Sequence, residues 1–369
     1  MIRLAAPHVD AADIEAVSDV LRSGHLVQGR QVAAFEAELS SAVGSAHSVA
    51  VNSCTSALHL ALLALGVTQG DEVLVPAFSW PATANVVAFC GAVPVFVDIE
   101  EKSFGMDPVA LNAVLRRHPS VKAIVPVHPF GEMADVPKIL AESEPRGISI
   151  IEDAACALGS ILDSRPAGRW GIMGCYSFHP RKAITTGEGG VIVTDDAILA
   201  RRLRMLRNHG LDPEAATPDF VLAGLNLRMT DLQAALGRTQ LRKLDMLIAS
   251  RRTQAAKYTS LLAGSSVTVP IARSASTHVF QSFVVLVPAD RASERDAIIA
   301  RMRADGVEAS IGTHHIPLTT FYRSRFGYAP GDFPVADAVA RRSIALPLHP
   351  LLTADDQNRV VAVLREHAG

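Results

Sequence analysis

The segment from residue 48 to residue 151 alternates short apolar, β-branched runs with segments of helical pattern. Runs of this kind are typical of β-strands, and helical crossovers between them are typical of a sheet with mostly parallel strands. Such a sheet buries both faces under helices, and ligands bind at the loops that follow the carboxyl ends of its strands. Strands are predicted at residues 48–51, 72–75, 93–97, 123–127 and 148–151.

A turn that contains Lys182 interrupts the next apolar region. The flanking residues 175–178 and 190–193 predict two more strands, which bring the mostly parallel sheet to about seven strands and indicate an α/β fold class. The turn is rich in Pro, Thr and Gly, and glycine lets a ligand approach the backbone closely. A lysine amine can form a Schiff base with an aldehyde, although the same pattern would suit a solvated lysine on a hairpin loop.

Capping signals mark the starts of two predicted helices. Asp10 is followed by Ile14 and Leu21 at helical spacing, which predicts the first helix of the chain. Thr230 and Gln233 form the pattern of a capping box. A long helix is therefore predicted from Thr230 toward the C-terminal third.

The pattern of the sequence changes at about residue 249. We predict a large α/β domain over residues 1–248 and a smaller α+β domain over residues 249–369. The smaller domain is predicted to contain strands at 279–287 and 307–311 and helices at 291–304 and 353–367.

Composition excludes several classes of protein. The 369 residues are 49% hydrophobic and 20% charged with a net charge of −2, and the lack of basic clusters argues against nucleic acid as a partner. No apolar run is long enough for a signal peptide or a membrane span, so we expect a cytoplasmic protein without a membrane partner. The cysteines show no CxxC spacing, which favours reduced thiols, and no metal site is predicted. These cysteines are Cys54, Cys90, Cys156 and Cys175.

Asp153 directly follows the apolar run at 148–151, at the carboxyl end of a predicted strand. If Lys182 held pyridoxal 5′-phosphate (PLP), a carboxylate here would keep the pyridinium nitrogen of the cofactor protonated. The positively charged ring is the electron sink of that chemistry. An aspartate at this position would equally serve as a helix N-cap.

Two further groups follow predicted strands, and a third residue, Ser177, lies inside the predicted strand at 175–178. Thr55 and Ser56 lie where a strand turns into a helix, and their hydroxyls together with free backbone N–H groups could hold a phosphate or simply cap the helix. Ser177 adds another hydroxyl near Lys182. Trp80 follows the strand at 72–75, where its ring could stack on a pyridine ring or pack in a core or interface.

Taken together, these motifs resemble the DegT/DnrJ/StrS family of PLP-dependent sugar aminotransferases. That family has the fold type I architecture of aspartate aminotransferase. The resemblance runs almost from end to end, and the segments around Lys182 and at 226–235 are specific to it. The matching segments are residues 23–29, 52–58, 79–85, 152–155, 177–182, 185–190, 226–235 and 346–350.

The resemblance implies roles for individual residues. Lys182 forms the Schiff base with PLP, and Asp153 holds the pyridinium nitrogen. One residue reaches the phosphate from the neighbouring subunit, which implies a homodimer with shared active sites. The remaining implied contacts are Trp80 on the ring, Thr55, Ser56 and Ser177 on the phosphate, and Asn226 from the neighbouring subunit.

The sequence departs from the family at a few positions. Cys156 stands where the family frequently has a glutamine that bonds the hydroxyl of the cofactor ring, and Cys54 stands where glycine is common. His25 replaces an aromatic residue. Because a thiol is a poor hydrogen-bonding group, we expect Cys156 to lie at the cofactor but to hold it differently.

The predicted reaction is transfer of an amino group from L-glutamate or L-glutamine to a keto group of a nucleotide-linked deoxysugar. Arg228, His314 and His315 are candidate residues of the substrate pocket, although exposed loop histidines would fit the same positions. Three alternatives remain. They are an aminotransferase acting on a cyclitol or another non-nucleotide ketone, a PLP-dependent dehydratase, and a non-catalytic PLP-binding regulator. Family dehydratases have histidine in place of the Schiff-base lysine, so Lys182 favours transamination.

Overall fold

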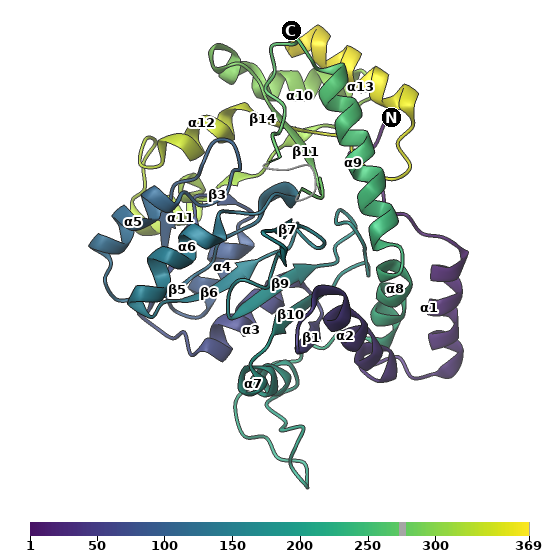
Figure 1. The fold of residues 1–369 in the computed structure, drawn as a ribbon, viewed down its shortest axis with the longest axis vertical. Coiled ribbons are helices and arrows are strands. Elements are labelled where there is room, and N and C mark those ends of the chain that lie inside the picture. Colours follow the sequence, from purple (N-terminus) through teal and green to yellow (C-terminus); the bar gives the residue numbers. More distant parts are fainter. Residues whose placement is uncertain (273–277, 369) are drawn as a thin grey trace.

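The structure, a computed structural model, describes residues 1–272 and 278–368. Its central sheet has seven strands in the order β1-β10-β9-β6-β5-β2-β4 (Figure 1). Strand β10 is antiparallel to both neighbours and every other pair is parallel, so the predicted seven-stranded, mostly parallel α/β sheet is confirmed. The strands are β1 (His47–Val51), β2 (Glu72–Pro76), β4 (Val93–Val97), β5 (Val121–Ile124), β6 (Ser149–Asp153), β9 (Met173–Ser177) and β10 (Gly190–Thr194).

Helices cover both faces of this sheet. Successive side chains of a strand point to opposite faces, so Val49 and Val51 pack in one apolar cluster and Ala50 packs in another. The first face carries α3 (Cys54–Leu65), α4 (Ala82–Phe89) and α7 (Ala197–Arg207). The second face carries α2 (Arg30–Val43), α5 (Pro108–Arg117), α6 (Val136–Ser143) and α8 (Asp231–Leu241).

A second, antiparallel sheet lies in the C-terminal third of the chain. Its order is β11-β14-β12, and three helices pack around its apolar cluster. The predicted strands at 279–287 and 307–311 are present but shorter, and β14 was not predicted. These elements are β11 (Phe283–Leu286), β12 (Ser310–Ile311), β14 (Ser343–Leu346), α9 (Leu244–Leu261), α10 (Arg295–Ala304) and α13 (Ala354–Ala368).

The two parts of the chain are joined by more than one segment. The predicted division between residues 248 and 249 lies inside α9, which runs without interruption past it. The N-terminal segment also crosses over, because Ile2 forms a parallel bridge with Val307 and Leu348 N–H donates to Leu4 O. The division into two domains therefore stays a prediction.

Both capping signals are confirmed, but the helix that each cap begins differs from expectation. The Thr230 hydroxyl accepts from Gln233 N–H at 3.2 Å in a complete capping box, yet the predicted long helix is two helices, α8 and α9. Helix α1 (Ala11–Ser23) begins at Asp10 as predicted. However, Ile14 and Leu21 are exposed at 61% and 56%. The helix packs on α8 instead through the buried carboxylate of Asp13, which accepts from Gln240, Thr239 and Lys243.

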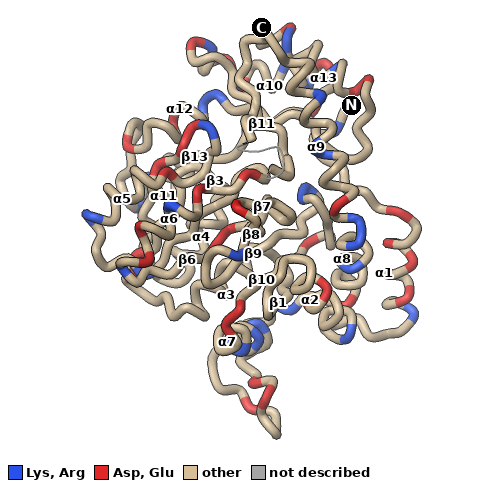
Figure 2. Tube along the Cα trace, in the orientation of Figure 1, with Lys and Arg blue, Asp and Glu red and all other residues tan. Residues whose placement is uncertain are grey.

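Acidic and basic positions are mixed along the trace (Figure 2), and the net charge is −2. Within residues 1–272 and 278–368, no helix combines the length and the apolar character that crossing a membrane requires. The loop after α7, residues 208–226, extends away from the body of the fold (Figure 1).

Candidate active site

The loop between β9 and β10 holds Lys182 in an ordered conformation. Phe178 O accepts two hydrogen bonds, from Thr186 N–H and from the Thr185 hydroxyl, both at 2.9 Å. Lys182 N–H donates to His179 O at 2.8 Å, and both threonines are buried. Hydrogen bonds from the backbone and from a threonine hydroxyl therefore fix the turn, which explains why threonine suits this position of the sequence.

The amine of Lys182 points into the protein. Its Nζ donates to Cys156 Sγ at 3.0 Å, in the turn that follows β6. Burial opposes the charged form, whereas Cys156, Cys54 and Asp153 favour it, and together they hold the pKa of Lys182 above its usual value. The alternative of a solvated hairpin lysine is therefore wrong.

Asp153 is the last residue of β6 and is 5% exposed, as its position after an apolar run predicts. Its Oδ2 accepts from Thr83 Oγ1 at 2.8 Å and its Oδ1 accepts from Ala155 N–H at 3.2 Å. Burial raises the pKa of Asp153, although Thr83, Ala155 and the Lys182 charge act in the opposite direction. The helix N-cap interpretation is wrong, because residues 154–160 form turns.

Thr83 was missed as a site residue by sequence reasoning. It lies fully buried near the start of α4, within the segment 79–85 that resembles the family and also contains Trp80. A threonine among apolar residues carries no sign that its hydroxyl meets a carboxylate 70 residues later in the chain.

The start of α3 carries the predicted phosphate hydroxyls. The N-cap is Ser53, which accepts from Ser56 N–H at 3.1 Å, so neither Thr55 nor Ser56 caps this helix. The Ser56 hydroxyl donates to Asn52 Oδ1 at 2.7 Å, and Thr55 is exposed. Gly190 is required beside them, since a Cβ there would lie 2.5 Å from the Ser53 carbonyl.

Trp80 and His314, predicted for separate roles, lie together. Strand β3 (Phe78–Ser79) pairs with β13 (His314–His315), and the rings of Trp80 and His314 meet edge to face at 5.3 Å. Trp80 is 62% exposed. His315 is nearly buried, its Nε2 is 3.4 Å from Asp337 Oδ1, and burial lowers its pKa. Only His314 of the two histidines therefore lies beside Trp80.

The segment 226–228 runs beside the residues that precede α3. Asn52 N–H donates to Leu227 O at 2.9 Å, and the backbone of Arg228 forms an antiparallel β-bridge with that of Val51. Asn226 is exposed, and the Arg228 guanidinium donates to the side chain of Asn208. Ser177, at the end of β9, is half-buried and accepts from His179 N–H at 3.4 Å. Thr55, Ser56 and Ser177 thus lie at the strand ends of one subunit, whereas Asn226 is predicted to act at the site of the neighbouring subunit.

A model of the DegT/DnrJ/EryC1/StrS aminotransferase family matches residues 7–365. The chain belongs to this family. The predicted resemblance is therefore confirmed, and the protein is an aminotransferase.

Two curated relatives are similar over nearly their whole length. The GDP-perosamine synthase of Caulobacter vibrioides is 36% identical over 366 residues, which is 98% of this chain and 97% of the relative. The UDP-N-acetyl-3-dehydro-alpha-D-glucosamine 3-aminotransferase of Acidithiobacillus ferrooxidans is 36% identical over 351 residues, covering 95% of this chain and 92% of the relative. Both relatives are named as enzymes of nucleotide-linked sugars.

Solved structures confirm the fold. PseC of Helicobacter pylori, an aminotransferase involved in the biosynthesis of pseudoaminic acid, aligns with a TM-score of 0.93 at 27% identity. It covers 100% of this chain and 99% of its own. The PLP-form of Spr1654 of Streptococcus pneumoniae aligns with a TM-score of 0.94 at 29% identity, covering 100% of this chain and 98% of its own.

Arg251 is a second residue of this aminotransferase that sequence reasoning missed. It lies in α9 and is 2% exposed. Its guanidinium donates to the carbonyl oxygens of Lys182 at 3.3 Å, Gln281 at 3.0 Å and Leu348 at 3.3 Å. Burial lowers the pKa of Arg251 to about 10. One side chain thus ties the Lys182 loop to the C-terminal third.

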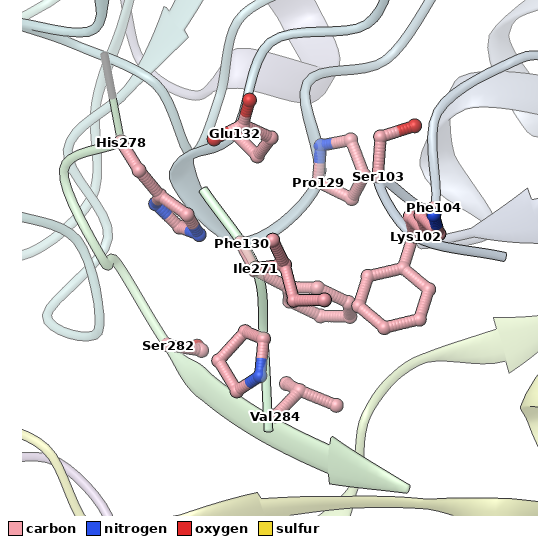
Figure 3. A pocket seen from close by; sticks show the side chains of 11 residues that line it. Lys102, Ser103, Phe104, Pro129, Phe130, Glu132, Ile271, His278, Ser282 and Val284 are labelled. Carbon is pink, nitrogen blue, oxygen red and sulfur yellow. The ribbon is translucent and has the colours of Figure 1, made fainter. Parts of the chain in front are cut away.

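Two small hollows lie near these elements. One is lined in part by Lys182 and Arg251. The other contains none of the predicted site residues, and Figure 3 shows the rings of Phe104 and Phe130 side by side in its wall. Its other lining residues are Lys102, Ser103, Pro129, Glu132, Pro270, Ile271, His278, Ser282 and Val284.

Proposed function

We propose that this aminotransferase uses PLP to transfer an amino group from L-glutamate or L-glutamine to a keto group of a nucleotide-linked deoxysugar. The observation that carries the proposal is the approach of the Lys182 amine to Cys156, in the turn after Asp153. Cys54, the first residue of α3, also acts on the charge of Lys182. The names of the two curated relatives support the class of substrate.

The residues present fit PLP. A buried carboxylate suits a ring nitrogen that carries a proton, and Asp153 is one whose polar partners are a hydroxyl and a backbone N–H. The exposed Thr55 hydroxyl and the start of α3 suit a phosphate, with Ser56 and Ser177 of the same subunit and Asn226 of the partner subunit as further partners. Trp80 would contact the ring, and Cys156 its hydroxyl. When bound, PLP supplies the electron sink that makes the carbon next to the amino group acidic.

Each protein group then has a definite task. Lys182 would hold the cofactor through Nζ. Once released, its free amine would carry the proton that leaves the substrate carbon bearing the nitrogen to C4′ of the cofactor, and would move it in the reverse direction when the ketosugar is aminated. A base must be neutral, so the charge that Cys156 and Asp153 favour on Lys182 has to be lost first. The Asp153 carboxylate would accept a hydrogen bond from the protonated ring nitrogen and so keep that nitrogen charged.

We also propose a homodimer with shared sites, as the family resemblance implies. Asn226 is exposed at the end of the extended loop, and Phe220, Val221 and Leu225 expose 63%, 52% and 49% of their surface just before it. Apolar side chains gathered on such a loop favour an interface. We expect Asn226 to reach the phosphate site of the partner subunit, and a fully active isolated monomer would contradict this arrangement.

The substrate pocket and the compartment remain predictions. His314 beside Trp80 is the better candidate for contact with the sugar, whereas Arg228 bonds Asn208 and His315 faces Asp337. Cysteines Cys54, Cys90, Cys156 and Cys175 are free, which is compatible with the expected cytoplasmic location.

A spectroscopic screen tests the function. The protein is converted to its pyridoxamine form with an amino donor, and nucleotide ketosugars are offered one at a time. Recovery of the absorbance of the aldehyde form identifies the acceptor. The Lys182→Ala variant should fold but lose both half-reactions, the one with the amino donor and the one with the ketosugar. Normal turnover by that variant would contradict the proposal. Turnover with inososes only, or loss of water without an amino donor, would support the cyclitol and dehydratase alternatives.

A further inference from the structure

One side chain from another element reaches the Asp153 carboxylate by a described hydrogen bond. Thr83 Oγ1 donates to Asp153 Oδ2 at 2.8 Å, whereas the bond from Ala155 N–H to Oδ1 is local to the turn. Thr83 is 0% exposed and Asp153 is 5% exposed, so water has little access to their bond. A hydrogen bond to a buried carboxylate is stronger than one between neutral groups.

The Thr83 hydroxyl is itself oriented by a neighbour. Ser79 Oγ lies 3.2 Å from Thr83 Oγ1, and Ser79 is also buried. Since the proton of Thr83 points to a carboxylate, which only accepts, Ser79 is the donor of the pair. Ser79 belongs to β3, whose partner strand carries His314. Two hydroxyls therefore connect the β3–β13 strand pair with Asp153.

We propose that Thr83 is a positioning residue that orients the Asp153 carboxylate and keeps it charged toward the ring nitrogen of the cofactor. The inference rests on the proposed function, because it takes Asp153 as the partner of that nitrogen. The physical reason is the balance at Asp153, where burial favours the neutral acid and a donated hydrogen bond favours the anion. Loss of the hydroxyl leaves the carboxylate with its local donor alone and free to rotate.

The test compares two cofactors that differ in one atom. In 1-deazapyridoxal 5′-phosphate a CH group replaces the ring nitrogen, so Asp153 has no proton to hold. The apoprotein of each variant is titrated with PLP and with the deaza compound by absorbance. Thr83→Val keeps the shape of the side chain and removes the hydroxyl, and Thr83→Ser restores it.

Thr194→Val is the matched control. Thr194 is 1% exposed, and its hydroxyl donates to Ile172 O at 2.8 Å, at the end of β10 remote from Gly190. The Thr194→Val variant therefore loses a buried hydroxyl whose hydrogen bond is as long as that of Thr83, at 2.8 Å, and Asp153 keeps its partners. Any general effect of removing a buried threonine hydroxyl appears in this variant too.

We expect Thr83→Val to weaken PLP binding by about tenfold and deaza binding by less than about twofold, as one charge-assisted hydrogen bond leads one to expect. Thr83→Ser and Thr194→Val should each stay within about threefold of the wild type for PLP. Equal weakening for both cofactors would overturn the inference, because it would make Thr83 merely structural. Unchanged PLP binding by Thr83→Val would overturn it as well.

Failure of the proposed function has a different signature. In that case the wild type itself would bind PLP without an absorbance change that depends on Lys182. A wild type that binds PLP through Lys182, together with a Thr83→Val variant that does not discriminate between the cofactors, would reject the role of Thr83 alone.

Discussion

Glu152 and Asp153 are neighbours in β6, and the pleat of the strand turns their side chains to opposite faces of the sheet. Both are buried, at 0% and 5% exposure. Asp153 accepts two hydrogen bonds, from Thr83 and Ala155. The Glu152 carboxylate accepts four, from His128 Nε2 at 2.8 Å and from the N–H groups of Gly168 at 2.9 Å, Trp170 at 2.6 Å and Gly171 at 2.7 Å.

The difference separates a structural carboxylate from one that has room for a ligand. A carboxylate has about four acceptor positions, and all of those of Glu152 are occupied by this protein. Asp153 retains capacity for another donor although it is also buried. A buried charge with too few hydrogen-bond partners lowers the stability of the fold. We expect a bound ligand to supply the missing partner at Asp153.

Asp153→Asn should have the largest effect on function. We expect transamination to fall by about 10³-fold or more, because an amide cannot stabilise the positively charged ring nitrogen. The free energy of unfolding of the cofactor-free variant should be equal to or above that of the wild type, since a buried charge has been removed. Single-turnover absorbance and urea unfolding measure the two quantities. An active Asp153→Asn variant would break the distinction between the two residues.

Glu152→Ala should show the reverse pattern. It leaves His128 and three backbone N–H groups buried without an acceptor, so the free energy of unfolding should fall by about 3 kcal/mol. The activity per folded molecule should change much less than in Asp153→Asn. Glu15→Gln, at a side chain that is 62% exposed, is the control and should stay within about 0.5 kcal/mol. An unaffected Glu152→Ala variant would contradict the structural role.

The pH dependence of stability should also distinguish Asp153. Its pKa in the folded protein is raised above the usual value of 3.8, chiefly by burial. The folded state then binds more protons than the unfolded state in the window above 3.8, so this residue lowers stability as the pH rises through that window. In cofactor-free protein, Asp153→Asn should therefore gain stability relative to the wild type as the pH is raised from about 4. A stability difference that is constant with pH would show that the burial of Asp153 carries no penalty.

Cys156→Gln should have the smallest effect. Cys156 accepts from Lys182 Nζ and stands where the family frequently has glutamine. We expect a change of about threefold or less in cofactor affinity, because a thiol contributes little hydrogen bonding that glutamine would not replace. Equilibrium dialysis with PLP measures the cofactor affinity. A loss of more than about tenfold would show that the thiol itself is needed beside Lys182.

Much of the fold was predictable from local pattern. The apolar runs at 72–75 and 93–97 became β2 and β4, and the Asp10 and Thr230 caps begin α1 and α8. These signals act over a few residues, through strand alternation, helical spacing and hydrogen bonds to the first turn of a helix. The exposed Ile14 shows their limit, since helical spacing says where a helix forms but not which face it buries.

The sequence by itself determined the strand–helix order, the turn that presents Lys182 and the strand-end position of Asp153. Three contacts were decided only by the tertiary structure. They are the hydrogen bond from Thr83 to Asp153, the ring contact of His314 with Trp80 and the hydrogen bond from Arg251 to the carbonyl oxygen of Lys182. Each of these contacts joins residues that are distant in the chain, so no local preference encodes it. They form because packing the helices on the sheet brings buried polar groups together, and a buried polar group must find a partner.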